Sequence, residues 1–513
     1  MTITPWCKVL CRIIYQAWFH PLAKYPGPVL AKFTNLYGAY HAWRGDIHRD
    51  MHRCHQKYGD HVRYAPNRVL INTTAALRDI YGHGAHVRKY GGYQVLSSKA
   101  ANTLTMSDKV QHAHRRRIIS QAFSENSLRK LEPAIQARIN RFCHLLRRQI
   151  PQQSQLADEW TPPFDMAHSY KLASPPVTNL AFDLMTAVSF GADYRTMEEP
   201  RFRYVVDAIE KSNVRLSVLM QASKLATGGL DRKLFPSAAQ AGARFVKFLR
   251  QLLKKRFQQA PTESVIDIFS FLQQCKDPDT GEGLSSMQIS TETATFIVAG
   301  SDTSSTTMAA LSHYLTWSPR CYKRAVGEVR TTFSSADEIV FGAKLNSCIF
   351  LRACLDEALR ITPPGGGPLW RVVEPGGTQI DGEYVPAGSE FGAGIYAMHH
   401  NPRNWPDPGN YMPERWLENR GNDTHETSEK KKKHVRQPYF PFNIGPRSCV
   451  GKHLALAQVM LTFAHLLWAF DIRRADADEG WLETEDTEPP EYMLQDHVTG
   501  QKEGPFLQFR PRV

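Results

Sequence analysis

The sequence predicts a mainly α-helical protein with a smaller share of β structure, on two observations. Apolar residues recur at helical spacing through residues 112–150, 239–259 and 286–317. From residue 363 onward, prolines and glycines separate short alternating runs at residues 378–380 and 383–385, which indicates irregular β structure. At about 1.5 Å per residue, the helix expected over residues 286–317 is long enough to cross a domain.

The remaining elements follow in chain order. Residues 60–64 and 68–72 predict two strands of a hairpin around Pro66-Asn67. Residues 222–236, which contain Gly228-Gly229, predict a loop, and the apolar residues 216–220 before it are suited to roofing an apolar pocket. Near the end of the chain, the acidic stretch over residues 475–491 predicts a surface loop and residues 506–509 predict a final strand.

The length of 513 residues and a hydrophobic content of 42% allow a large buried core, so the chain is globular. Its nine cysteines are scattered and form no Cys-x-x-Cys pair. An odd number of scattered cysteines argues for a reducing compartment, and against a disulfide framework or a structural zinc site.

The formal net charge of +13 does not indicate nucleic-acid binding, because the basic residues are dispersed along the chain. The longest basic run, residues 430–433, lies in a polar stretch over residues 419–437 that we interpret as a solvated loop. A basic surface is suited both to an acidic electron-donor protein and to anionic lipid, and the sign of the charge does not choose between them.

The first 28 residues predict an amphipathic helix followed by a stiff hinge. Two apolar rows with a basic edge on the opposite side are suited to lying in a membrane interface, although a first helix packed on the protein fits equally well. Prolines 21, 26 and 28 then break the helix. No segment has the ~20 apolar residues that span a bilayer. The apolar rows are Val9, Ile13 and Ala17, and Leu10, Ile14 and Trp18.

The most specific motif is the loop over residues 441–451. Cys449 stands directly before an apolar helical run, where the helix dipole and free N–H groups favour a thiolate. Gly445 and Gly451 keep the loop slim enough for a large flat cofactor to approach. Arg447 supplies a cation that suits an anionic group. A buried structural cysteine is the alternative, and the several specified positions in this short loop argue against it.

The middle of the long helix breaks the usual composition of helices. Residues 299–307 place a glycine, an acid and several hydroxyls where alanine and leucine would be more favourable, and such violations tend to mark function. Gly300 would let a small ligand press against the helix. Thr303 would direct its hydroxyl to that ligand rather than to its own backbone, and Asp302 would relay a proton. A Ser/Thr-rich helix tolerated by packing is the alternative interpretation.

Together these motifs resemble the cytochrome P-450 family. The loop fits the family's Phe-x-x-Gly-x-Arg-x-Cys-x-Gly pattern, which implies that Cys449 is the axial thiolate ligand of haem b. The long helix fits the family's oxygen-activation motif, which implies that Thr303 and Asp302 serve bound dioxygen. The resemblance covers nearly the whole chain and looks closest to fungal microsomal members. The loop pattern is carried by Phe442, Gly445, Arg447, Cys449 and Gly451.

The resemblance implies roles for two further groups of residues. Glu357 and Arg360 fit the family's Glu-x-x-Arg pair, and Arg415 would join them in a structural cluster that holds the haem loop. Arg371, and His112 with Arg116 one turn away on a helix, would bind the haem propionates together with Arg447, although the register among residues 115–117 stays open. The fold implied is a mainly α domain with a small β-rich lobe, the cytochrome P-450 fold, over residues 29–513.

The function implied is that of a monooxygenase, in which RH, O2, two electrons and two protons give ROH and water. No Gly-x-Gly-x-x-Gly fingerprint follows a strand, so NADPH would act through a separate flavoprotein reductase that docks near the loop, with Lys452 and residues 430–433 contributing. The substrate would be a lipophilic small molecule, by default an intermediate of fungal secondary metabolism. The resemblance also places the enzyme on the cytosolic face of the endoplasmic reticulum membrane, with an N-terminal anchor that is short or truncated.

Two other classes of function stay open at this point. One is a haem-thiolate isomerase, dehydratase or peroxygenase that needs no electron donor; such enzymes often lose the acid–alcohol pair, which is intact here as Asp302 and Thr303. The other is a non-enzymatic haem-binding sensor or transport protein, which would need no proton relay.

Overall fold

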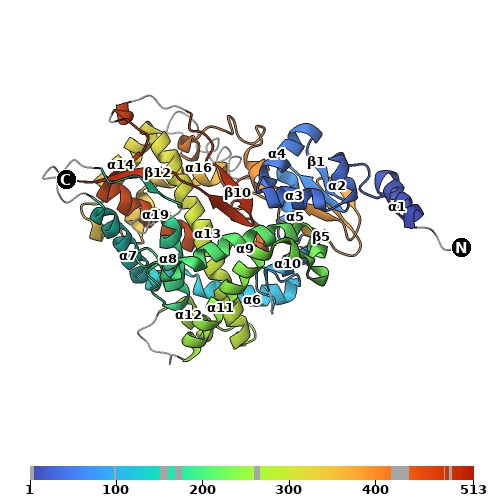
Figure 1. Ribbon diagram of the computed structural model, residues 1–513, viewed down its shortest axis with the longest axis horizontal. Coiled ribbons are helices and arrows are strands. Elements are labelled where there is room, and N and C mark those ends of the chain that lie inside the picture. The colour runs from blue at the N-terminus through green and yellow to red at the C-terminus, as the bar shows by residue number, and fades with distance from the viewer. Residues whose placement is uncertain are drawn as a thin grey trace.

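The computed structural model describes residues 5–97, 100–150, 160–167, 176–258, 266–417, 438–478, 480–483 and 488–512. Helices make up most of this structure, and short strands gather mainly in a smaller lobe beside the N-terminal helices (Figure 1). The predicted fold class, mainly α with a small β-rich lobe, is confirmed. The α-helices are α1 Pro5–Ile14, α2 Val29–Phe33, α3 Leu36–Arg44, α4 Ile47–Tyr58, α5 Thr74–Tyr81, α6 Lys109–Ala122, α7 Glu125–Arg148, α8 Val177–Phe190, α9 Arg203–Gln221, α10 Leu230–Leu234, α11 Pro236–Gln258, α12 Ile268–Gln274, α13 Ser286–Trp317, α14 Pro319–Thr332, α15 Ala343–Ser347, α16 Ile349–Ile361, α17 Ile395–His399 and α19 Lys452–Ala469.

The strands form four small sheets in the described part of the chain. The largest has the order β1-β2-β8-β5-β3 and builds the lobe together with the β6–β7 hairpin. The β10–β11 hairpin lies near the middle of the molecule, beside α13 and α9 (Figure 1). The strands are β1 His61–Ala65, β2 Arg68–Ile71, β3 Val87–Lys89, β4 Phe164–Asp165, β5 Arg371–Val373, β6 Thr378–Ile380, β7 Glu383–Val385, β8 Glu390–Gly392, β9 Phe470–Arg474, β10 Leu494–His497, β11 Thr499–Lys502 and β12 Phe506–Pro511.

Short helical turns of 3-10 or π type connect several of these elements. They matter for the site because one of them, η7, forms the turn before Cys449. They are η1 Tyr15–Phe19, η2 Gly91–Leu96, η3 Pro200–Phe202, η4 Ser223–Gly229, η5 Ala336–Glu338, η6 Pro413–Trp416, η7 Gly445–Arg447 and η8 Trp481–Glu483.

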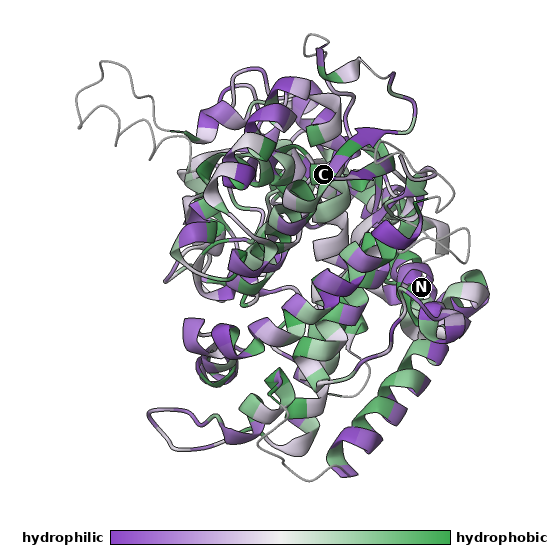
Figure 2. Ribbon diagram, turned by 90° about the vertical axis from the view of Figure 1, so that its left-hand side faces the viewer, coloured by the Kyte–Doolittle hydropathy of each residue, from purple (hydrophilic) through white to green (hydrophobic). Residues whose placement is uncertain are grey.

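The long helix α13 runs across the α-rich part and packs mainly on α8, α16 and α19 (Figure 1). It begins with a capping box, in which Ser285 and Gln288 satisfy each other's backbone N–H groups. Its predicted bounds, residues 286–317, are confirmed. Apolar residues gather where the helices meet and polar residues lie outside (Figure 2).

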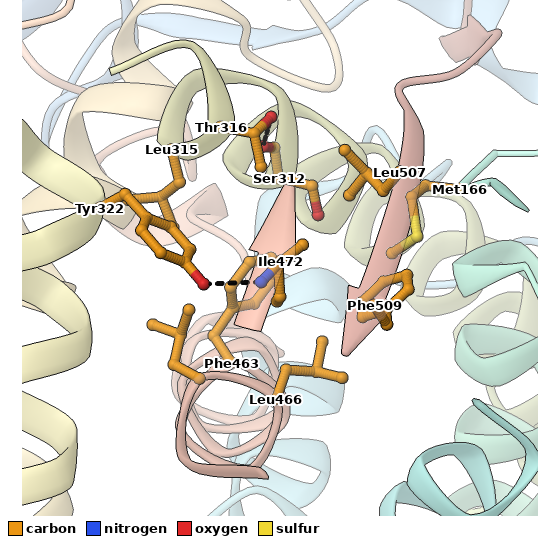
Figure 3. Close-up of a pocket in the computed structure, with 11 residues that line it drawn as sticks. Met166, Ser312, Leu315, Thr316, Tyr322, Phe463, Leu466, Ile472, Leu507 and Phe509 are labelled. Atoms are coloured by element: carbon orange, nitrogen blue, oxygen red, sulfur yellow. Dashed lines mark hydrogen bonds between the residues drawn. The ribbon is translucent and has the colours of Figure 1, made fainter. Parts of the chain in front are cut away.

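The C-terminal half of α13 meets α14, α19, β9 and β12 in an apolar part of the core (Figure 3). Tyr322 closes this part by accepting a hydrogen bond from the Ile472 N–H at 2.7 Å. A small apolar pocket lies here. Its lining residues Phe463 and Leu466 are about 20 Å along α19 from the residues next to Cys449, so this pocket is separate from the candidate site.

Several sequence-based boundaries need correction. The helix expected over residues 112–150 is two helices, α6 and α7, because Ser124 caps a new N-terminus by accepting from the Ser127 N–H. Residues 222–236 are not a plain loop but carry η4 and α10. Val218 and Met220 pack on the N-terminal helices and the lobe rather than roofing a pocket. The hairpin around Pro66-Asn67 and the final strand are confirmed, whereas residues 419–437 and part of 475–491 lie outside the described residues.

The N-terminal segment exposes its apolar face. α1 extends away from the body of the molecule (Figure 1), while the end of the segment is held by Arg63, which donates to the Gln16 carbonyl oxygen at 2.7 Å. Among the residues described, no helix is long and apolar enough to cross a bilayer. The exposed apolar side chains are Trp6, Val9, Leu10, Ile13, Ile14, Tyr15, Trp18 and Phe19.

Candidate haem-binding site

The cysteine loop is folded by its own backbone. The Cys449 N–H donates to the Phe442 carbonyl oxygen at 2.8 Å, and the Ser448 N–H donates to that of Gly445 at 3.1 Å. This closure presents Cys449 directly before α19, as the sequence predicts. The residue keeps accessible surface.

The pKa of the Cys449 thiol differs from the sequence-based expectation. Burial raises this pKa, and the Gly451 N–H, Arg116 and Lys452 oppose the rise without overcoming it. The helix terminus and nearby cations therefore act in the expected direction but are weaker than desolvation. A bound metal ion would displace the proton, because a coordinating thiol is deprotonated.

The structure explains the two loop glycines differently from the sequence-based expectation. At Gly445, with φ of +69°, a Cβ atom would lie 1.9 Å from the Tyr81 carbonyl oxygen, so the close approach of α5 requires glycine here. At Gly451 a Cβ atom would make only ordinary contacts, 3.9 Å from Phe123 and 4.0 Å from Cys449 Sγ. Packing of the loop on α5, rather than room for a cofactor, explains the first glycine.

Four basic side chains converge beside this loop from β3, β5, α6 and η7; we call Lys89, His112, Arg371 and Arg447 the cation cluster. Lys89 and Arg371 are cross-strand partners in the β3–β5 pairing, an arrangement of like charges that destabilises a sheet. Arg447 donates to the Met106 and Ser107 carbonyl oxygens, and Arg371 to those of Leu369 and Trp370. Lys89 donates to the Leu104 carbonyl oxygen, and among the described residues no member of the cluster lies within ion-pair distance of a carboxylate.

Burial and mutual repulsion lower the pKa values of three members of the cation cluster, and the Asp108 carboxylate opposes the shift at Arg447. Burial and then repulsion by Arg371 lower the pKa of Arg447 to about 10. Burial lowers the pKa of His112 to about 3, with repulsion from Arg447 and Lys89 adding to it. The pKa of Lys89 lies well below its ordinary value, through burial and then repulsion by Arg371 and Arg447. The cluster is therefore a ready-made site for anionic groups.

The structure separates the three arginines of α6. Arg116 turns to the cysteine loop and donates to the Ser448 carbonyl oxygen at 2.7 Å. Arg115 instead contacts Glu292 at 3.3 Å, and Arg117 contacts Asp277 at 2.8 Å. The register that the sequence left open thus places His112 and Arg116 on the face of α6 toward the loop.

A second cluster, the Glu357 cluster, is fully paired. Arg360 donates to both oxygens of Glu357 at 3.0 and 2.8 Å, and Arg415 donates to Oε1 at 2.9 Å. Trp416 Nε1 and the Met412 N–H complete the acceptor capacity of the carboxylate. Arg360 also donates to the carbonyl oxygen of His399, whose ring accepts from the Phe440 N–H at the start of the cysteine-loop segment. The Glu357 cluster thus acts as a scaffold for that segment.

In the middle of α13 the side chains do not lie as expected. A Cβ atom on Gly300 would lie 2.6 Å from the end of the flexible Met185 side chain, so this glycine allows close packing of α13 on α8. The Thr303 hydroxyl donates to its own helix, at the Ala299 carbonyl oxygen, at 2.6 Å. Its lone pairs stay available as acceptors. The buried Ser304 hydroxyl forms no hydrogen bond among the described residues.

Asp302 is buried and turns toward α9 and the β10–β11 hairpin, where Asn213 and Thr499 donate to its carboxylate. These partners, and Lys89 in the cation cluster, were missed by the sequence analysis. Lys89 occupies a short strand far from any motif, and the partners of Asp302 come from distant parts of the chain. No periodicity or spacing in one sequence marks them.

The donor set fits a haem group. The accessible thiol of Cys449 lies in a loop beside basic side chains whose hydrogen bonds go to backbone carbonyl oxygens, which is the complement of an iron porphyrin with two propionates. Cys449 would ligate the iron, and the cation cluster would hold the propionates. The described residues contain no cluster of His, Cys, Asp and Glu that could hold another metal ion.

Residues 25–495 match the family model for cytochrome P-450, and the chain belongs to this family. It is 46% identical over 498 residues to the cytochrome P-450 monooxygenase poxM of Penicillium oxalicum, covering 97% of this chain and 92% of that protein. It is 42% identical to atnE of Emericella nidulans (98% and 94% covered) and 41% identical to AKT7 of Alternaria alternata (98% and 95% covered), both also cytochrome P-450 monooxygenases.

The protein is therefore a haem-thiolate monooxygenase, an enzyme that requires a redox partner and acts on lipophilic molecules. The bound haem supplies the activation of dioxygen.

Proposed function

We propose that this monooxygenase holds haem b through Cys449 and the cation cluster, and that it oxidises a lipophilic intermediate of secondary metabolism with electrons from an NADPH-dependent flavoprotein reductase. The observation that carries the proposal is the unpaired cation cluster beside an accessible cysteine. Residues 29–513 would form a single catalytic domain, since elements near the two ends of this range contact each other, as α3 and β10 do.

The proposed roles of the protein's residues follow from their contacts. Arg447, Arg371, His112 and Lys89 would neutralise the propionates, and Arg116 would steady the loop through Ser448. Thr303 would turn its hydroxyl from Ala299 to donate a hydrogen bond in the distal pocket, and Asp302 would relay protons to it. Gly300 would let a small ligand lie against α13, and in the structure it also allows close packing on Met185 of α8.

The electron supply is proposed on charge and on the exposed face near the loop. The net charge is +13, and Lys452 and His453 at the start of α19 are exposed. An acidic reductase would be attracted to this face, because complementary charges raise association rates. The basic run at residues 430–433 lies outside the described residues and is part of the proposal only through its sequence.

The membrane proposal rests on exposed apolar surface. Beyond the N-terminal segment, α2 exposes Val29 and Leu30, and α3 exposes Leu36, Tyr40 and Trp43. A basic amphipathic segment that continues into further exposed apolar residues is suited to the headgroup boundary of a membrane. By family analogy this membrane is the endoplasmic reticulum, with the enzyme on the cytosolic face.

The relatives named above support the substrate class only at the level of fungal monooxygenases. We propose a secondary-metabolite intermediate, and comparison by mass spectrometry of metabolites made with and without this chain in its native host would identify it. If deletion of this chain leaves every lipophilic metabolite unchanged, this part of the proposal is contradicted.

The test of the haem assignment is the spectrum of the reduced protein with carbon monoxide. Thiolate ligation gives a red-shifted Soret band, which Cys449→His should abolish, while Cys275→Ala at a cysteine away from the site should keep it. A wild-type spectrum typical of histidine ligation would overturn the assignment.

Turnover tests the acid–alcohol pair. Thr303→Ala should leave NADPH consumption intact while more of it ends as hydrogen peroxide and less as product. If coupling does not change in Thr303→Ala, the unpaired hydroxyl of Ser304 becomes the next donor to replace.

A further inference from the structure

The C-terminal hairpin β10–β11 is built against the middle of α13. The Thr306 hydroxyl donates to the Gly500 carbonyl oxygen at 3.1 Å, and a Cβ atom on Gly500 would lie only 3.0 Å from the Thr306 side chain. On the other side of the hairpin, Gln501 donates to the Glu210 carbonyl oxygen of α9 at 2.6 Å. The hairpin is therefore fixed between the two helices next to Asp302.

Lys502 of this hairpin is a buried lysine with one charged neighbour. Its side chain has 0% exposure, and its Nζ lies 3.6 Å from Oδ1 of Asp302, whose own side chain is 4% exposed. Among the described residues, neither Nζ nor this Oδ1 has a hydrogen-bond partner. A buried ammonium without a carboxylate would be very costly, so the two charges depend on each other.

The other oxygen of Asp302 is held from two elements. Asn213 of α9 donates to Oδ2 at 3.1 Å, and the Thr499 hydroxyl of β11 donates to the same atom. Asn213 also donates to Thr499 Oγ1 at 3.0 Å, so these groups form one network. Both hydrogen-bond donors therefore reach Oδ2, while the Lys502 ammonium lies beside Oδ1, an arrangement that suits an acceptor-only carboxylate at Asp302.

Thr303 follows Asp302 directly but has other contacts. Consecutive side chains on a helix project about 100° apart, and the Thr303 hydroxyl is bonded to α13 itself. An ionised Asp302 that is held by the hairpin can neither donate a proton nor turn toward Thr303. To relay, it must take up one proton, and its interaction with Lys502 must weaken at that moment.

We propose that Lys502, with Asn213 and Thr499, is a positioning residue that holds Asp302 ionised and turned to the β10–β11 hairpin, so that proton relay through Asp302 depends on this hairpin. The part that concerns relay rests on the proposed role of Asp302. The positioning itself does not, because it follows from buried charges that the chain holds with or without turnover.

The direct test is infrared spectroscopy of the full-length holoenzyme. Without the ammonium, a buried carboxyl group is neutral rather than ionised, so Lys502→Met should add a protonated-carboxyl band at neutral pH. The band should be absent from the wild type and from Lys502→Met/Asp302→Asn. A Lys502→Met spectrum without the band would overturn the proposal.

Thermal unfolding provides a second test of the Asp302–Lys502 pair. Lys502→Met and Asp302→Asn should each lower the melting temperature, and the double variant should recover much of the loss, since neither charge is left alone. Additive losses would overturn the pairing. If Lys502→Met does not fold, recovery of folding in the double variant supports the proposal and failure of the double variant contradicts it.

Turnover measurements distinguish a failure of this inference from a failure of the proposed proton relay by Asp302. Asp302→Asn should slow product formation by at least about 100-fold, the lower range for a positioned proton donor, with a larger solvent isotope effect. Lys502→Met should also change the isotope effect, whereas Gln501→Met, which loosens the hairpin from α9 without touching Asp302, should not. An effect of Asp302→Asn without one of Lys502→Met would overturn the inference; no effect of Asp302→Asn would overturn the relay alone.

Discussion

The chain buries arginine side chains in two places that differ in what neutralises them. In the Glu357 cluster, Arg360 and Arg415 share one carboxylate, and their remaining N–H groups reach backbone carbonyl oxygens. In the cation cluster, Arg371 and Arg447 have only carbonyl oxygens, and Lys89 adds a further charge beside them. The first cluster is complete within the protein, whereas the second gains its balance only from an anionic ligand.

This difference separates a scaffold from a binding site by electrostatics alone. A buried ion pair is weak evidence of stability, but removing one partner is strongly destabilising. Buried cations without acids cost free energy in the unliganded protein, and sites of this kind tend to be functional. Four measurements would break or sharpen this comparison.

The largest effect is expected in the Glu357 cluster. Glu357→Gln leaves Arg360, with 0% side-chain exposure, and Arg415 without their counter-charge. Unfolding in urea should show a loss of about 3–5 kcal/mol, as for other broken buried pairs. Glu414→Gln is the matched control, because Glu414 is 34% exposed and pairs with Arg320 on the surface, a contact worth at most about 1 kcal/mol. Equal losses in both variants would contradict the scaffold role.

The next effect separates binding from stability in the cation cluster. Lys89→Met keeps a side chain of similar length and removes the ammonium, which faces Arg371, lies over the Tyr93 ring and donates to the Leu104 carbonyl oxygen. The apoprotein should be no less stable than the wild type, because repulsion is relieved. Haem transfer to apomyoglobin should nevertheless accelerate about tenfold, which corresponds to 1.4 kcal/mol of binding. A less stable apoprotein with unchanged haem retention would place Lys89 in the scaffold instead.

The smallest effect is on pH dependence. The pKa of His112 is about 3 in the folded protein against 6.5 for an ordinary histidine, so the unfolded state binds the extra proton between these values. The contribution of neutral His112 to stability is therefore complete above pH 6.5 and is lost as the pH falls toward 3, at no more than about 1.4 kcal/mol per pH unit.

In His112→Gln, the free energy of unfolding of the apoprotein should fall less steeply with acid by this amount, measured by urea unfolding between pH 4 and 7, which covers most of the range. Haem should reduce the difference between variant and wild type, because propionates favour the charged imidazole. If the two apoprotein curves have the same slope, the surroundings of His112 are not those described.

The sequence was sufficient for the fold class and for the local motifs. The cysteine loop, the acid and alcohol of α13 and the Glu357–Arg360 pair each lie within a few neighbouring residues, so their spacing is visible in one chain, whereas Arg415 comes from a distant segment and was placed by the resemblance. The long helix was found for the same reason, since its pattern is local. Lys89, Asn213 and Lys502 escaped because only the packing of distant elements gives them their neighbours.

Expectations based on the sequence were also wrong where burial by distant elements competes with local effects. We expected the helix terminus to favour a thiolate at Cys449, and desolvation instead raises the pKa of the thiol. We expected Gly445 to make room for a cofactor, and the Tyr81 backbone takes that room. Both outcomes depend on which atoms arrive from other elements, which propensity and spacing do not contain.

The central claim is that the cation cluster exists to bind the two carboxylates of haem. The most direct measurement compares the affinity of the apoprotein for haem b and for its dimethyl ester, which has the same iron and ring but no propionate charge. The wild type should prefer haem b by about 100-fold or more, since hydrogen bonds to charged groups contribute about 1.5–3 kcal/mol each. The preference should shrink in Arg447→Met. Equal affinity of the wild type for both forms would contradict the claim.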